Sequence, residues 1–184
     1  MKTLIFNGSP RRDGDTAALL AAFRAPLGGE ITQIDAYRCG IAPCVDCRWC
    51  WTHAECALHD GMARVFAEMD AADNLVIASP VYFSELTGPL LSVFSRLQLL
   101  FAAAAIRRAP LLEKKPRRGV VLLVRGGSGS GRRAEETAEN LLRHMGAEPF
   151  GIVRSERTDT LPAREDRAAL AAAAALGARC AERR

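Results

Sequence analysis

Four of the six cysteines in this 184-residue chain lie close together, in the pattern C-x2-C-x2-C-x5-C. Short gaps between cysteines allow their thiolates to converge on one small inorganic centre. A compact run of this kind suits an iron–sulfur cluster, whose irons are held by cysteine thiolates. Zinc sites more often use two separated C-x2-C pairs. The spacing therefore favours a [4Fe–4S] cluster bound by Cys44, Cys47, Cys50 and Cys56.

The same segment is open to other interpretations. His53 is separated by two residues from Cys50 and by two residues from Cys56, and this spacing also fits a zinc site. The flanking Trp49 and Trp51 suit either of two roles, a shield that keeps water from a cluster or part of a dimer face. A zinc-based or thiol-based redox sensor is therefore an alternative to the cluster.

A second signal follows the apolar run at residues 3–7. Residues 8–16 (GSPRRDGDT) combine glycines, hydroxyl groups and arginine immediately before a helical pattern. Backbone N–H groups at the start of a helix bind phosphate, and an arginine such as Arg11 adds a charged fork. The loop is neither a Walker A motif nor G-x-G-x-x-G. The alternative is an ordinary turn in which Asp15 or Thr16 caps the helix.

Short apolar runs alternate with amphipathic segments along the chain. Uninterrupted Val, Ile and Leu runs predict strands buried on both faces, and hence a parallel sheet between helices. The pattern indicates one α/β domain over residues 1–184 with a cysteine-rich insertion at 39–56. The predicted strands are 3–7, 30–35, 74–79, 119–125 and 149–153, and the predicted helices are 15–23, 61–70, 87–101, 133–145 and 162–181.

The segments with chemical potential follow predicted strands. Residues 8–16, 80–84 and 126–131 follow the first, third and fourth strands, and the cysteine segment follows the second. Ligands of parallel sheets bind beyond the carboxyl ends of the strands. We therefore expect all four segments to converge at one edge of the sheet. Glycines at 126–131 allow close approach of a ligand, although Gly-Ser repeats also occur in flexible linkers.

Two of these segments resemble the FMN-binding loops of flavodoxin-like NAD(P)H-dependent FMN reductases. They are Gly8-Ser9-Pro10-Arg11 with Gly14-Asp15-Thr16, and Ser79-Pro80-Val81-Tyr82-Phe83. The resemblance implies a flavodoxin-like three-layer α/β/α sandwich with a five-stranded parallel sheet in the order 2-1-3-4-5. It also implies FMN contacts from Ser9, Arg11, Asp15, Thr16, Ala17, Pro80, Val81, Tyr82, Phe83, Gly126, Gly127 and Ser128. From the residues alone, Tyr82 and Phe83 fit equally well as core or interface side chains.

The cysteine segment, from Pro43 to Met62, resembles the subgroup called iron–sulfur flavoproteins. This resemblance implies a [4Fe–4S] cluster near FMN and a homodimer or a dimer of dimers. The chain departs from the family pattern at several positions. Relatives usually have Asn or Ser in place of Asp15, and two acidic residues in place of Asp60-Gly61. They often have Lys in place of Leu91 and Asp-Arg in place of Ser95-Arg96.

Composition restricts the partners. The net charge is +4, but the basic run at 107–118 lacks interleaved aromatic residues, so we do not expect nucleic-acid binding. The apolar stretch at 97–105 is interrupted by Gln98 and is shorter than the roughly 20 residues of a membrane span. The N-terminus does not read as a signal peptide. These features predict a cytoplasmic protein without a membrane partner.

Together these features predict an FMN-dependent NAD(P)H oxidoreductase. FMN supplies the redox chemistry in such proteins, so no protein residue need act as a catalytic acid or base. NAD(P)H is the expected electron donor, and a cluster would carry electrons from FMN to an acceptor that the sequence does not identify. The alternatives are a non-catalytic electron carrier like flavodoxin, which the positive net charge disfavours, and the zinc or thiol sensor.

Overall fold

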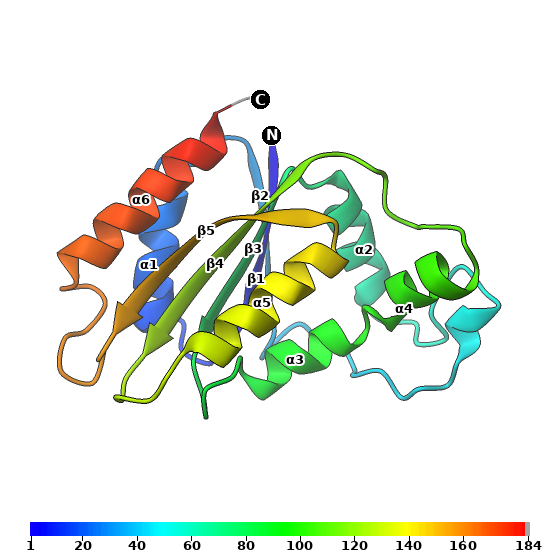
Figure 1. The fold of residues 1–184 in the computed structure, drawn as a ribbon, viewed down its shortest axis with the longest axis horizontal. Coiled ribbons are helices and arrows are strands. Elements are labelled where there is room, and N and C mark those ends of the chain that lie inside the picture. Colours follow the sequence, from blue (N-terminus) through cyan, green and yellow to red (C-terminus); the bar gives the residue numbers. More distant parts are fainter. Residues whose placement is uncertain (183–184) are drawn as a thin grey trace.

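The computed structural model describes residues 1–182 and contains a five-stranded parallel sheet (Figure 1). The strand order is β2-β1-β3-β4-β5, which confirms the predicted topology. Each strand is an apolar run whose alternate side chains face opposite sides of the sheet. The strands are β1 Lys2–Asn7, β2 Glu30–Asp35, β3 Asn74–Pro80, β4 Arg117–Arg125 and β5 Ala147–Glu156.

Helices cover both faces of the sheet (Figure 1). On one face, α1 (Asp15–Arg24) and α6 (Arg167–Ala181) pack over a core that includes Ile5, Val76 and Val120. On the other face, the core includes the alternate strand residues Leu4 and Ile77. It is covered by α2 (Met62–Ala71), α3 (Gly88–Ser95) and α5 (Arg132–His144). The three layers are those predicted from the apolar runs.

The predicted helix at 87–101 is interrupted in the structure. Helix α3 ends at Ser95, α4 spans Gln98–Phe101, and a π-helical turn, η2, spans Ala102–Ile106. At the break, the N–H groups of Arg96 and Leu97 each bond to a carbonyl three residues back, at 3.1 and 2.9 Å. By length and composition alone, the helical stretch 88–106 would be able to cross a membrane, and half of its apolar window is buried in the protein.

The last helix also starts later than predicted, at Arg167 rather than at residue 162. The carboxylate of Asp166 accepts a hydrogen bond from the N–H of Ala169 at 3.0 Å, which caps the helix at this position. The preceding residues, 157–166, form a loop at the carboxyl end of β5. This loop brings a fifth segment to the edge of the sheet where the sequence placed the functional loops.

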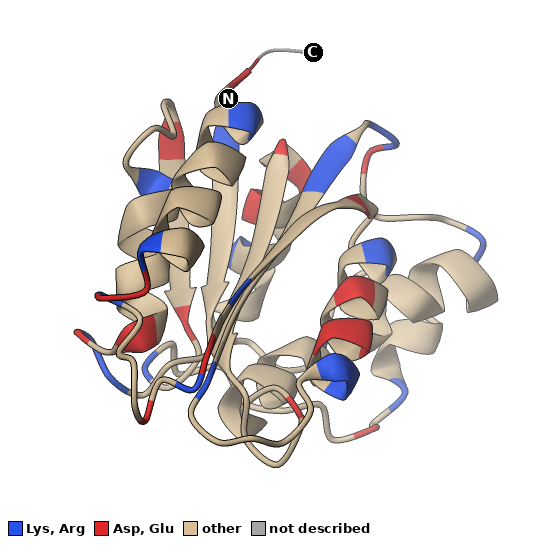
Figure 2. Ribbon diagram, turned by 60° about the vertical axis from the view of Figure 1, so that its left-hand side comes forward, with Lys and Arg blue, Asp and Glu red and all other residues tan. Residues whose placement is uncertain are grey.

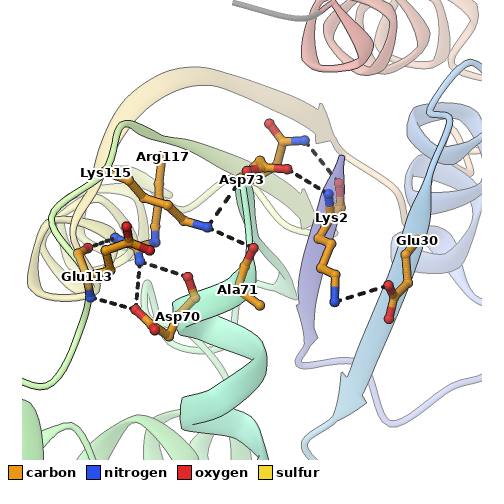
Figure 3. Close-up of polar contacts among 10 residues, drawn as sticks. Lys2, Glu30, Asp70, Ala71, Asp73, Glu113, Lys115 and Arg117 are labelled. Carbon is orange, nitrogen blue, oxygen red and sulfur yellow. Dashed lines mark hydrogen bonds and ion pairs between the residues drawn. The ribbon is translucent and has the colours of Figure 1, made fainter.

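Part of the basic run at 107–118 is buried and makes structural contacts. The side chain of Arg117 is 1% exposed and pairs with Asp70 on α2 at 3.1 Å (Figure 3). Arg117 also donates to the carbonyl of Glu113 at 2.9 Å. Lys115 donates to the carbonyl of Ala71 at 2.9 Å. These contacts fasten the connection to the amino-terminal end of the sheet.

Acidic and basic residues are interspersed over the helices and loops (Figure 2). On α5, Arg132 pairs with Glu136 at 2.7 Å and Arg143 pairs with Glu139 at 3.1 Å. Exposed pairs of this kind contribute little to stability. Much of the positive charge is thus paired with nearby acidic residues. That the protein does not bind nucleic acid stays a prediction.

Candidate functional site

The loop after β1 begins at a glycine that has no room for a side chain. Gly8 donates its N–H to the carbonyl of Ala78 at 2.7 Å, and its carbonyl accepts from the hydroxyl of Thr87 at 2.8 Å. A Cβ atom at this position would lie 2.7–2.9 Å from side-chain atoms of Leu90, Thr87 and Ser79. The absence of a side chain lets the loop pass close to β3 and to the start of α3.

The following residues shape the loop in front of α1. Ser9 donates its N–H to the side-chain oxygen of Asn7 at 3.0 Å, and its hydroxyl bonds to the carbonyl of Arg11 at 3.1 Å. Thr16, in the first turn of α1, is buried. The first N–H groups of a helix have no partner within the helix. The loop therefore gathers hydroxyl groups, a guanidinium and free N–H groups, which are the donors that a phosphate requires.

Asp15 does not cap α1, and neither does Thr16, so the capping alternative is wrong. The N-cap residue is Gly14, which makes no side-chain cap. One carboxylate oxygen of Asp15 accepts from the N–H of Ala163 at 2.9 Å, and the other pairs with Arg11 at 2.7 Å. The carboxylate thus ties the loop after β5 to the start of α1 and holds the guanidinium of Arg11.

Replacement of Asp15 by asparagine (Asp15→Asn) is expected to tighten FMN binding several-fold. The amide oxygen of asparagine can still accept from the N–H of Ala163, but the negative charge is lost and Arg11 is freed to bind phosphate. Flavin fluorescence quenching at two salt concentrations measures the effect. Arg11→Gln is the matched control and should weaken binding. Weaker binding by Asp15→Asn would show that the pairing of Asp15 with Arg11 positions the loop.

The loop after β3 is a tight hairpin. Tyr82 and Glu85 exchange backbone hydrogen bonds of 2.9 and 3.0 Å, and the two residues between them, Phe83 and Ser84, have φ of +51° and +65°. Positive φ is unusual for bulky residues. The hairpin is fixed to α5 because Glu85 accepts from the hydroxyl of Thr137 at 2.9 Å. Phe83 is fully exposed, so its interpretation as a core residue is wrong.

A cavity of about 200 Å³ lies where the loops after β1, β3, β4 and β5 meet. Four of the predicted FMN contacts, Ala17, Phe83, Gly127 and Ser128, do not line it. The residues predicted from the sequence that do line it are Ser9, Arg11, Asp15, Thr16, Pro80, Val81, Tyr82 and Gly126. The structure therefore brings together two thirds of the predicted set.

Sequence reasoning missed Thr158 and Asp159, which line the cavity from the loop after β5. The carboxylate of Asp159 lies so close to Gly126 that a Cβ atom at Gly126 would overlap it. Sequence reasoning also missed Tyr37, which follows β2 and lies near Tyr82 and Thr87. Burial raises the pKa of Tyr37 and the neighbouring Tyr82 raises it further, although contact with Thr87 lowers it. Their positions in the sequence could have identified them, since each of these residues follows a parallel strand.

The four clustered cysteines line a second, smaller cavity, of about 20 Å³. Its other walls include Trp51, Arg96, Gln98 and Leu99. Burial raises the pKa of the Cys50 thiol, and the three other clustered thiols raise it further, whereas a backbone hydrogen bond lowers it. Four soft ligands that line one small cavity match the ligand chemistry of an iron–sulfur cluster.

The two cavities share no lining residue, which corrects the expectation that all four segments converge. The cysteine segment leaves the edge of the sheet after β2, where Arg38 bonds to the carbonyl of Pro10 at 2.5 Å. It then runs beside α3 and α4, away from the loops after β4 and β5 (Figure 1). A cysteine segment packed against these helices places its thiols to one side of the nucleotide loops.

His53 does not line the cysteine cavity. Its ring stacks on Trp49, with 3.4 Å between the ring centres, and its Nδ1 lies 3.2 Å from the carbonyl of Trp49. Within residues 1–182, no three His, Cys, Asp or Glu side chains are grouped closely enough to hold a single metal ion. Trp51 lines the cavity and Trp49 does not, so only Trp51 is placed to shield the thiols.

A known family of reductases matches most of the chain. The family model described as NADPH-dependent FMN reductase matches residues 1–153. The chain belongs to this family. Its match begins at β1 and ends within β5, so it includes the loops after β1, β3 and β4 and the cysteine segment. The assignment agrees with the resemblance drawn from the two FMN loops.

Curated relatives extend the comparison to the cysteine-containing subgroup. The chain is 29% identical over 99 residues to an iron–sulfur flavoprotein of Methanocaldococcus jannaschii, covering 52% of this chain and 51% of the relative. It is 29% identical over 103 residues to an iron–sulfur flavoprotein of Methanosarcina thermophila, covering 54% of each. The chain therefore spans about half the length of the curated relatives it matches.

Solved structures share the fold of this reductase-family chain over nearly its whole length. An NAD(P)H:quinone oxidoreductase from Methanothermobacter marburgensis superimposes with a TM-score of 0.76 and 19% identity, covering 100% of this chain and 98% of the other. An FMN-dependent NADH-azoreductase from Bacillus anthracis, solved with FMN, gives a TM-score of 0.72 and 19% identity, covering 99% and 100%. Both comparisons support the flavodoxin-like fold.

Proposed function

We propose that this chain is an FMN-dependent NAD(P)H oxidoreductase that also carries a [4Fe–4S] cluster on its four clustered cysteines. The observation that carries the proposal is a cavity at the start of α1 in which predicted FMN contacts from three separate loops meet. Family membership supports the same activity. The separate thiol-lined cavity and the iron–sulfur flavoprotein relatives support the cluster.

The cavity at the start of α1 fits the phosphate end of FMN. Ser9, Thr16 and Arg11 supply donors, and the dipole of α1 favours an anion. At 200 Å³ the cavity is smaller than the roughly 300–1,000 Å³ of most ligand pockets. It would therefore enclose the phosphate and the sugar chain, leaving the flavin ring against Tyr82 and the hairpin.

When bound, FMN would supply the chemistry of hydride acceptance from NAD(P)H and onward electron transfer. The protein binds and orients the cofactor. Arg11 offsets the phosphate charge, and Gly8 and Gly126 keep side chains away from the paths of their loops. The rigid hairpin holds Tyr82 at the cavity mouth through the bond of Glu85 to α5. We propose that a second copy of the chain covers the exposed Phe83 beside this mouth, forming a homodimer.

The thiol-lined cavity fits a cluster better than a single zinc ion. The four thiols surround one space, whereas His53, the proposed zinc ligand, is turned toward Trp49. A cubane cluster has four irons, each of which takes one thiolate, so its ligands need not meet at a single point. Cys44, Cys47, Cys50 and Cys56 would hold the irons, and the cluster would convert hydride chemistry into one-electron steps.

The proposal is tested on protein purified without oxygen. We expect flavin absorption bands over a broad iron–sulfur shoulder, about four irons and four sulfides per chain, and steady NAD(P)H oxidation without a protein partner. Sedimentation of the same sample reports whether the chain is a dimer. Cys47→Ala should lose the iron and keep FMN, and Cys180→Ala is the matched control because Cys180 is buried in α6 away from the motif.

Each contrary result would contradict a different part of the proposal. Absence of bound flavin after incubation with excess FMN would overturn the oxidoreductase. Flavin without NAD(P)H oxidation would indicate an electron carrier. Iron retained by Cys47→Ala would refute the ligand assignment, and zinc in place of iron would favour a sensor.

A further inference from the structure

The end of α3 lies against the cysteine segment and bonds to it at several points. The hydroxyl of Ser95 accepts a hydrogen bond from the N–H of Cys44 at 2.9 Å and donates to the carbonyl of Ser92 at 2.6 Å. The first cysteine of the motif is thereby attached to the last turn of a core helix. Because α3 is packed in the core by Leu90 and Phe94, this end of the motif has a rigid support.

The next residue, Arg96, bonds to both ends of the cysteine segment. Its guanidinium donates to the carbonyl of Ala42, before the motif, at 3.0 Å, and to the carbonyl of Leu58, after the motif, at 3.2 Å. It also pairs with Asp60 at 2.7 Å. Asp60 in turn accepts from the N–H of Ala42 at 3.1 Å. The Arg96–Asp60 pair therefore fixes the separation of the two segments between which the four cysteines lie.

Arg96 is also a buried charge next to the thiols. Its side chain is 1% exposed, it lines the cysteine cavity, and its Nε has no hydrogen-bond partner among the described residues. Arginine is not deprotonated in proteins, and the ion pair with Asp60 at 2.7 Å favours the charged form. The guanidinium therefore remains charged. A buried cation is costly unless nearby negative charge offsets it, and thiolates bound to iron would supply such charge.

We infer that Arg96 is a positioning residue of the cysteine centre, which holds both ends of the motif in place and sets a permanent positive charge beside Cys56. The inference rests on the proposed function, because the charge acts on a bound cluster. Reduction adds an electron to the cluster, and a nearby cation stabilises the reduced form. The charge on Arg96 should therefore raise the reduction potential of the cluster, which is sensitive to local charge and hydrogen bonding.

Three variants separate position from charge. Arg96→Met removes both the hydrogen bonds to the cysteine segment and the positive charge. This variant should lose at least half of the bound iron, and the potential of the remaining cluster should shift to a more negative value. Arg96→Lys keeps the charge but offers no planar fork for two carbonyls, so the potential should return toward that of the unmodified protein while iron stays low. Ser95→Ala removes two hydrogen bonds, of which one reaches the cysteine motif, and no charge. It should reduce the iron content without moving the potential.

The readouts are iron and sulfide per chain, cluster potential from a redox titration followed by electron paramagnetic resonance, and FMN content. Arg117→Met is the matched control, because Arg117 is an equally buried cation that pairs with Asp70 (Figure 3) and does not line the cysteine cavity. It should lower thermal stability but leave the iron content and the potential unchanged. FMN content tests folding, and if Arg96→Met loses FMN, Arg96→Lys and Ser95→Ala decide the outcome.

Two results distinguish this inference from the proposal on which it rests. Unmodified protein without iron would overturn the proposed cluster, and the role of Arg96 with it. Unmodified protein that carries iron, together with an Arg96→Met variant of unchanged iron content and potential, would overturn only the role of Arg96. Equal shifts of potential in Arg96→Met and Arg117→Met would also overturn it, since they would show an effect of general destabilisation.

Discussion

FMN binding is expected to weaken by about a hundredfold when Gly8 is replaced by valine (Gly8→Val). A side chain at this position meets Leu90, Thr87 and Ser79 at 2.7–2.9 Å for its Cβ atom alone, and valine adds two further methyl groups. Overpacking a buried site costs about 1–3 kcal/mol, and each 1.4 kcal/mol is a factor of ten in affinity. The cost falls on the loop that would hold the phosphate.

The measurement is the FMN dissociation constant, from fluorescence quenching, with the unfolding temperature of the flavin-free protein determined alongside it. Gly28→Val is the matched control, because Gly28 is exposed and a Cβ there has no neighbour within 4 Å. The control should bind FMN as the unmodified protein does. Unchanged affinity in Gly8→Val would mean that the loop after β1 does not hold the phosphate.

Among the variants described here, replacement of Gly177 by leucine (Gly177→Leu) is expected to lower the free energy of unfolding most. Gly177 is buried in α6, and a Cβ atom there would overlap the carbonyl of Phe23 in α1. A backbone atom cannot move aside as a side chain does, so α6 must separate from α1. Overpacking of this kind costs about 3 kcal/mol or more, which is a large part of the roughly 5–15 kcal/mol that stabilises a typical protein.

Urea denaturation followed by circular dichroism measures this change. Ala178→Leu is the matched control, since it adds the same side chain one residue further along α6 at an exposed position. The control should alter the free energy of unfolding by about 0.5 kcal/mol or less, as most surface substitutions do. A Gly177→Leu variant as stable as Ala178→Leu would show that α1 and α6 do not pack at this distance.

The positions of the FMN loops could be predicted because they depend on local sequence and on topology. Buried apolar runs such as those in β3 and β4 predict parallel strands, and parallel strands place their following loops at one edge. Ser9, Pro80 and Gly126 accordingly line one cavity. Thr158 and Asp159 obey the same rule, but the loop after β5 carries no glycine or cysteine motif that would single it out.

Other features depend on contacts between residues far apart in the sequence. The break in the helix at Arg96 was not predicted, because the apolar pattern continues through it. The residue that turns inward there meets Asp60, 36 positions away. Likewise, Asp15 was predicted as an FMN contact, with a helix cap as the alternative, but its carboxylate accepts a hydrogen bond from the N–H of Ala163, 148 positions away. Local spacing contains no information on such partners.

The sequence by itself determined the α/β class, the composition of the nucleotide loops and the set of four cysteines. These follow from the alternation of buried strands with helices and from the spacing of residues with distinctive chemistry, whereas the strand order was implied by the resemblance to FMN reductases. Only the tertiary structure decided that the thiols occupy a cavity separate from the nucleotide loops, with Arg96 between the ends of their segment. The physical reason is that an irregular segment takes its path from the surfaces against which it packs, here those of α3 and α4.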